Sequence, residues 1–234
     1  MKITTKLILV FFILLFSLNL ISEQNLNYFQ NDDIKTYISD EISPFCGGIN
    51  YQQYDSLEIN NIKLIKVKIA DSNSWYENLF SLIINNEGYI NDIYKGNFSG
   101  FVNVEFENEI FCEFSATIKI SGDWKDHLES ENLIVSLNIN LENGNILGIT
   151  KFKLLIPKTR SSEDEIFATT LISSLGYVAP KTFFVDAIVN DGKKYRYLFQ
   201  EKIVKELIES NKFREGPIIQ AEGYYRWNNP NYVE

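Results

Sequence analysis

A lysine and an arginine near the middle of the chain are suited to hold an anion. Lys153 lies in the alternating segment 152–156, which is typical of a β-strand. Arg160 follows just before a predicted helix, and backbone N–H groups at a helix start attract anions. Together they are suited to contact an anionic group such as a phosphate. The alternatives are a Lys153 whose ammonium reaches water and an Arg160 that is a solvated loop residue.

Other charged residues are candidates for a place at the same site. Lys119 and Lys151 lie on neighbouring predicted strands and rival Lys153. Glu165 follows Ser162 by three residues, the spacing of a capping box, so helix capping explains it, and an ion pair with Lys153 is the alternative.

Glu201 lies where a predicted hairpin gives way to a helix. The resemblance to a kinase-like fold described below implies that backbone groups of the hinge meet adenine at this place. We consider a direct nucleotide contact for its carboxylate, with a solvated or capping side chain as the alternative.

Metal and hydrolase chemistry have little support in the sequence. Asp123 and Asp126 stand beside the single histidine, His127, but this spacing is more typical of a polar turn than of a metal site. The chain has no His-Glu-x-x-His, no Cys-x-x-Cys and no Gly-x-Ser-x-Gly pattern. We therefore predict no metal site from these residues and assign no catalytic residue.

The elements that must position these residues indicate an α+β protein with a β-rich N-terminal region over 23–122. Alternating apolar residues predict strands at 62–69, with a bulge, and an antiparallel pair at 102–106 and 110–114. Ser74 and Glu77 have capping-box spacing and open a helix whose Leu79, Phe80, Ile83 and Ile84 we expect to face inward. The segments 115–121 and 133–141 extend the sheet.

The region 123–234 reads as an antiparallel sheet with helices. After the strand 152–156 come an amphipathic helix at 163–175 and a hairpin of strands 182–189 and 195–199, joined by turn residues 190–193. A second amphipathic helix follows around Leu207. The charged stretch 123–132 is the predicted boundary, although the sheet is free to continue across it.

Over about 115–222 the chain resembles the CotH kinase-like family, the spore-coat-type and secreted relatives of protein kinases. The segments that carry the resemblance are Ile118-Lys-Ile-Ser-Gly122, Phe152-Lys-Leu-Leu155, Leu175-Gly176-Tyr177, Ala179-Pro180, the hairpin turn from Val189 to Gly192, Tyr197 to Glu201, and Phe213-Arg-Glu-Gly216. Their order, strand, helix, hairpin and helix, is that of a kinase small lobe.

The resemblance implies an atypical protein kinase. It implies that ATP and Mg²⁺ bind between two lobes and that phosphate passes to a hydroxyl of a secreted or surface protein. The catalytic and metal-binding aspartates of such proteins lie in the second lobe, so we expect a fragment that ends before it. Kinases orient the strand lysine with a mid-helix glutamate, whereas 167–173 contain no acid. The main alternative is a non-catalytic envelope protein that binds a protein or glycan, or serves a structural role.

The ends and the bulk composition favour an exported bacterial protein. Residues 1–22 pair Lys2 and Lys6 with a following apolar run, which predicts a signal peptide, with an uncleaved membrane tether as the alternative. The expected location is periplasmic, at the cell surface or membrane-anchored. In such an oxidising compartment Cys46 and Cys112 can form one disulfide; two free cysteines are the alternative. A net charge of −9 argues against nucleic acid as a partner.

Overall fold

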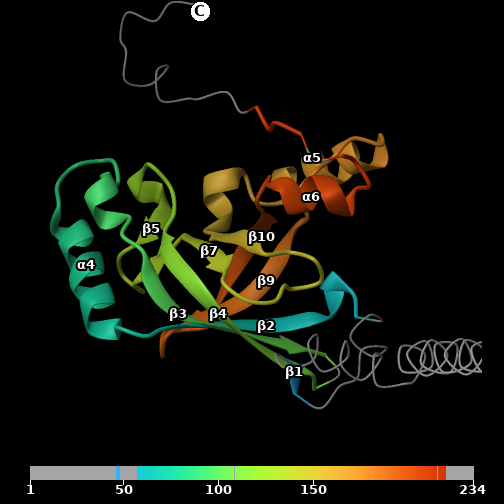
Figure 1. Ribbon diagram of the computed structural model, residues 1–234. Helices are drawn as coiled ribbons and strands as arrows, with labels where there is room; N and C mark the ends of the chain where they lie inside the picture. Colours follow the sequence, from blue (N-terminus) through green and yellow to red (C-terminus); the bar gives the residue numbers. More distant parts are fainter. Residues whose placement is uncertain (1–45, 48–56, 108, 215, 220–234) are drawn as a thin grey trace, which may run out of the picture.

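The structure is a computed structural model that describes residues 46–47, 57–107, 109–214 and 216–219. The predicted signal segment 1–22 lies outside the described residues. Seven of the described strands close into a barrel (Figure 1). These strands are β2 (Ile62–Ile69), β3 (Phe98–Phe106), β4 (Phe111–Ile120), β7 (Leu137–Leu141), β8 (Lys151–Leu155), β9 (Thr182–Val189) and β10 (Tyr195–Glu201).

The barrel interleaves the two predicted regions. Its strand order is β4-β3-β2-β9-β10-β8-β7, and β7 pairs again with β4 to close the ring. The neighbours are antiparallel except for β2 and β9, which run parallel, with Ile65 opposite Ala187. Strands from both sides of the 123–132 boundary therefore share one sheet. The α+β class predicted from the sequence is confirmed at this level.

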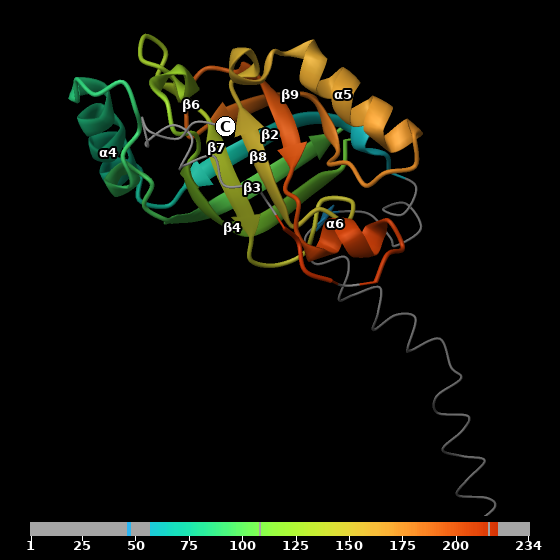
Figure 2. The ribbon, with the colours of Figure 1, turned by 90° about the horizontal axis from the view of Figure 1, so that it is seen from above.

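Shorter strands, helices and 3-10 turns lie around the barrel. They are β1 (Cys46–Gly47), β5 (Leu128–Glu129), β6 (Ile134–Val135), the helices α4 (Ser72–Ile84), α5 (Glu163–Ser174) and α6 (Lys205–Ser210), and the 3-10 turns η1 (Ile59–Asn61), η2 (Asp92–Tyr94), η3 (Lys125–His127) and η4 (Pro157–Arg160). Figures 1 and 2 both place α4 on one side of the barrel and α5 and α6 on the other. In the view of Figure 2, no described helix crosses β7 and β8.

Aromatic side chains fill part of the barrel interior. Phe199 stacks between Phe152 and Phe183, with ring centroids 4.6 Å from each. Tyr197 is also buried, and burial raises the pKa of its hydroxyl. Because side chains alternate along each strand, these inward residues leave their sequence neighbours on the outer face. The interior is a packed core.

Most strand predictions are confirmed, and the cap of the first helix is not as predicted. The predicted bulge in β2 appears as a register shift between Ile62 and Leu64. Helix α4 begins two residues before the predicted cap, because Asp71 accepts the backbone N–H of Ser74 at 3.0 Å and serves as the N-cap. The buried residues of α4 are Trp75, Leu79 and Leu82, so the predicted inward placement of Phe80 and Ile84 is wrong.

Helix α5 contradicts its predicted packing. Its apolar residues Phe167, Leu171 and Leu175 are 69%, 46% and 65% exposed, whereas Thr169 is buried. The predicted capping box is also absent, because Ser162 makes no side-chain capping bond. The sequence pattern gave the helix correctly but not the direction of its apolar side, which the position of β9 and β10 decides.

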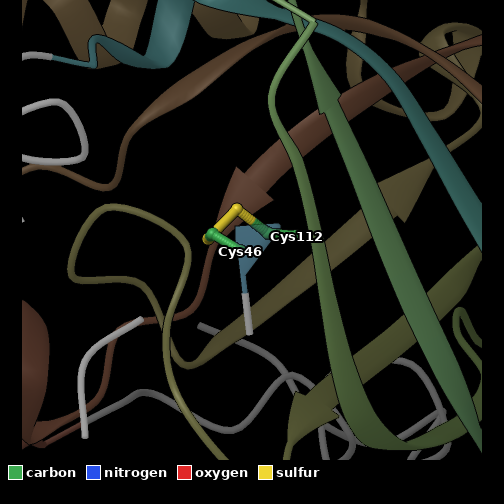
Figure 3. Close-up of a disulfide and its surroundings, with 2 residues drawn as sticks. All are labelled: Cys46 and Cys112. Atoms are coloured by element: carbon green, nitrogen blue, oxygen red, sulfur yellow. A yellow bond between two sulfur atoms is a disulfide. The ribbon is translucent and has the colours of Figure 1, made fainter. Parts of the chain in front are cut away.

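The disulfide joins β1 to the barrel. Cys46 and Cys112 are bonded and stand opposite each other where β1 pairs with β4 (Figure 3). On the same edge of β4, β7 pairs with the other end, from Ala116 to Ile120. The bond therefore fixes a short strand to the part of β4 that β7 leaves open.

Replacing Gly100 should test the tight contact between β3 and its neighbours. A Cβ at this position would collide with the carbonyl oxygen of Lys68 and lie 2.7 Å from Ile118 Cδ1. We expect Gly100→Ala to lower the free energy of unfolding by about 1–3 kcal/mol in urea denaturation. At Gly96 the nearest atom would be 4.0 Å away, so Gly96→Ala serves as the control. Equal effects at the two positions would contradict this packing.

Removing the disulfide should destabilise the fold. The two cysteines are 66 residues apart in sequence, and a cross-link over a loop of this size stabilises by about 2–4 kcal/mol, chiefly by restricting the unfolded chain. The double variant Cys46→Ala/Cys112→Ala should lose that amount in urea denaturation, and wild type under reducing conditions should match it. An unchanged midpoint on reduction would show that the bond carries no stability.

Candidate functional site

A row of polar side chains crosses the outer face of the barrel. Asn138 of β7 stands opposite Lys119 of β4 on one side and Lys153 of β8 on the other, and Lys153 stands opposite Gln200 of β10. Cross-strand partners project from the same face of a sheet. This face is the outer one, since the flanking residue Leu154 is buried in the core.

Lys153 is only partly exposed on this face. Burial lowers the pKa of its ammonium, and the nearby charges of Arg160 and Lys119 lower it further, while Asp123 acts in the opposite direction. Among the described residues Lys153 forms no salt bridge. An ammonium in such a place is stabilised by an anion from solution.

Arg160 reaches this neighbourhood through η4, and a buried serine fixes η4 there. Ser136 Oγ accepts the backbone N–H of Ile156 at 2.9 Å, directly before η4 begins. The same oxygen lies 2.9 Å from His127 Nδ1, at the end of η3. Ser136 therefore joins the two turns that flank Lys153.

Asp123, one of the two carboxylates weighed for a metal site, and the neighbouring His127 have structural partners. Asp123 accepts a hydrogen bond from Lys95 Nζ at 2.8 Å, and this bond lowers the pKa of the carboxyl. His127 is buried, which lowers its pKa and favours the neutral ring. Gly122, with φ of +102°, leaves the space that the His127 ring occupies. Across the described part of the chain no group of three or more His, Cys, Asp or Glu side chains is arranged to hold a metal.

Glu165 bonds a partner other than Lys153. Its Oε1 accepts a hydrogen bond from Gln200 Nε2 at 2.5 Å. Gln200 in turn stands opposite Lys153 in the sheet. Glu165 therefore contacts the row of polar side chains through Gln200. It forms neither the predicted capping box nor a direct ion pair with Lys153.

Glu201 points into the barrel end, away from Lys153. Its side chain is buried, its Oε2 accepts the backbone N–H of Lys181 at 3.1 Å, and burial raises the pKa of its carboxyl. The outward residue at this position is its neighbour Gln200. The structure therefore brings Lys153, Arg160 and Glu165 to one face and leaves Glu201 on the other.

Sequence reasoning missed the amide and lysine residues that share this face. Asn138, Asn140, Gln200 and Lys202 were not predicted as site residues. Their placement depends on which strands pair and in which register, and β7 meets both β4 and β8 only in the closed barrel. The alternation of Asn and apolar residues over 137–141 marks outward amides, but not what lies beside them.

Comparison with known proteins leaves this geometry as the main guide to function. No protein-family model matches the chain, and no curated protein matches it either. Among the residues that the structure describes, none of the helices has the length and apolar character needed to cross a membrane. The site is therefore interpreted from its own residues.

Removing the Ser136 hydroxyl should loosen the two turns beside Lys153. In Ser136→Ala the buried N–H of Ile156 and the ring nitrogen of His127 lose a partner, which costs about 1–3 kcal/mol. We expect that loss in the free energy of unfolding measured in urea. Ser81→Ala, which removes an exposed hydroxyl bonded to the Glu77 carbonyl, should change it by less than about 0.5 kcal/mol. A Ser136→Ala protein as stable as wild type would contradict this role.

Proposed function

We propose that the outer face beside Lys153 binds the phosphates of a nucleotide, and that the chain is part of an exported CotH-like kinase. In this proposal ATP is the phosphate donor and a secreted or surface protein is the acceptor. The observation that carries it is Lys153 itself, a partly buried ammonium with Arg160 and Lys119 close by and no salt bridge within the described residues. Clustered cations of this kind are suited to phosphate groups.

The order of elements along the chain supports the small-lobe resemblance, whereas the closure of the sheet into a barrel and the partner of Glu165 depart from it. Strand β8, helix α5 and the β9–β10 hairpin follow one another as the resemblance requires. In kinases a helix glutamate pairs with the strand lysine. Here Glu165 bonds Gln200, which stands opposite Lys153 in the sheet, so Glu165 and Lys153 are linked only through Gln200.

The described residues fit the phosphates better than the metal. Lys153 and Arg160 would contact phosphate oxygens, and charge neutralisation is the chemistry that Mg²⁺ supplies when it binds with ATP. Asp123 is the acid whose negative charge acts on Lys153, but its carboxylate accepts a hydrogen bond from Lys95. We therefore assign no metal ligand and no catalytic base to this part of the chain.

Export and a location outside the cytoplasm belong to the same proposal. The Cys46–Cys112 bond supports it, because disulfides persist mainly in oxidising compartments. The signal or membrane tether at 1–22 lies outside the described residues and stays a prediction.

The second candidate function is a non-catalytic envelope protein that binds a partner. The observation that favours it is α5, whose Phe167, Leu171 and Leu175 are exposed. Apolar side chains gathered on one side of a helix are typical of surfaces that contact other proteins. The kinase proposal does not account for this exposed apolar surface.

Nucleotide binding tests the first proposal. Isothermal titration of the purified chain with MgATP should give binding that Lys153→Met weakens about tenfold to a hundredfold, because a charged phosphate contact is lost. Lys68→Met, on the outer side of β2 across the barrel, should bind as wild type. Unchanged MgATP affinity in Lys153→Met would reject Lys153 as a phosphate ligand. Absence of binding by wild type would reject nucleotide binding by this part of the protein.

A further inference from the structure

Four lysines share the outer face where β4, β7, β8 and the end of β10 meet. Lys119 and Lys153 flank Asn138 across two strands. Lys151 lies two residues before Lys153 on β8, and the backbone N–H of Lys202 donates to the Lys151 carbonyl at 3.0 Å. We call these four residues, together with Asn138 and Asn140, the lysine–amide face.

The positive charges of this face lack counter-ions. None of the four lysines forms a salt bridge in the part of the chain that the structure describes. Burial lowers the pKa of Lys202, and the neighbouring charges of Lys153, Lys119 and Lys151 lower it further. The acid whose charge acts on Lys153 is Asp123, and its carboxylate pairs with Lys95 instead. A chain with a net charge of −9 thus gathers uncompensated cations on one face.

The amides between the lysines are also incompletely bonded. Asn138 stands between Lys119 and Lys153, and Asn140 between Thr117 and Lys151. The Oδ1 atoms of both asparagines are buried and accept no hydrogen bond. An unsatisfied buried amide oxygen is costly, and a half-turn of the side-chain amide, which exchanges Oδ1 and Nδ2, would bring the oxygen toward the surface and a ligand donor. The face therefore offers cations for acidic groups and acceptors for hydroxyls.

We propose that the lysine–amide face binds a glycan that carries acidic groups. The lysines would pair with its carboxylates or phosphates, and the asparagine amides would accept its hydroxyls. Residues two apart on a strand are about 7 Å apart, and positions across two strands are about 10 Å apart. Charges spread over this area match a polymer with several acidic units better than one phosphate group.

The positive charge of the lysine–amide face would also attract a nucleic acid or an acidic peptide. The types of side chain on this face favour a glycan over these two ligands. Residues of the lysine–amide face include no aromatic ring on which a base would stack. An acidic peptide provides carboxylates and one backbone N–H donor per residue, whereas a glycan offers several hydroxyl donors on each sugar unit to the two amide oxygens. The proposal goes beyond nucleotide binding, because it depends on Lys151, Lys202 and Asn140, which a nucleotide at Lys153 and Arg160 does not require.

Binding of hexasaccharides and matched anions tests this proposal. Titration calorimetry at low, fixed ionic strength would compare hexagalacturonate, neutral maltohexaose, hexaglutamate and a single-stranded DNA hexamer. We expect hexagalacturonate to bind at least tenfold more tightly than maltohexaose and at least fivefold more tightly than the other two anions. Comparable or tighter binding of hexaglutamate or DNA would overturn the glycan assignment, as would equal binding of the neutral sugar.

Variants separate this face from the nucleotide proposal. Lys151→Gln/Lys202→Gln should weaken hexagalacturonate binding at least tenfold and MgATP binding by a much smaller factor, because Lys153 and Arg160 remain in place. Lys63→Gln/Lys68→Gln removes two exposed lysines of β2, across the barrel, and should change neither. Asn140→Ala should weaken hexagalacturonate but not hexaglutamate. Wild-type glycan affinity in Lys151→Gln/Lys202→Gln would overturn the proposal, whereas a wild-type chain that binds hexagalacturonate but not MgATP would count only against the nucleotide proposal.

Discussion

Strand β7 pairs with β4 along one edge and with β8 along the other. This double pairing closes the barrel and brings the polar residues of its outer face together. Without that strand, the β4 and β8 edges would expose unpaired backbone groups, and Lys119 would not share a row with Lys153. The parallel contact of β2 with β9 joins the remaining edges. The outer face thus combines a pair of strands that are close in sequence, β7 and β8, with β4 and β10, which come from other parts of the chain.

A consequence of this closure is that like charges are held together. Lysines on an open or flexible surface would separate, but strand register keeps Lys119, Lys151 and Lys153 as neighbours. Packing energy from the aromatic core, including the stacked Phe152 and Phe199, offsets the repulsion. The pKa values of Lys153 and Lys202 are lowered, first by burial and then by the neighbouring cations, as this arrangement of like charges requires.

Local pattern predicted much of the secondary structure because alternation and turn chemistry act over a few residues. The hairpin of β9 and β10, with its turn at Asn190 and Gly192, could be predicted in this way. The outward position of Gln200 beside an inward Glu201 could not, since the face of a strand depends on what packs against it. The exposed apolar side of α5 was unpredictable for the same reason: Thr169, not Phe167, meets the rest of the fold.

The location of any ligand follows from how the barrel is filled. Small barrels leave room inside for a ligand only when their inward side chains are short or sparse. Here Phe152, Phe199 and Tyr197 occupy the interior and are almost fully buried. In the part of the chain that the structure describes, a ligand is therefore left with the outer face of the barrel, the turns at its ends or the surfaces of the helices. The uncompensated lysines lie on that outer face, and the Ser136 contacts fix the turns η3 and η4 beside them, so the same closure that excludes a ligand from the interior builds a place for one outside.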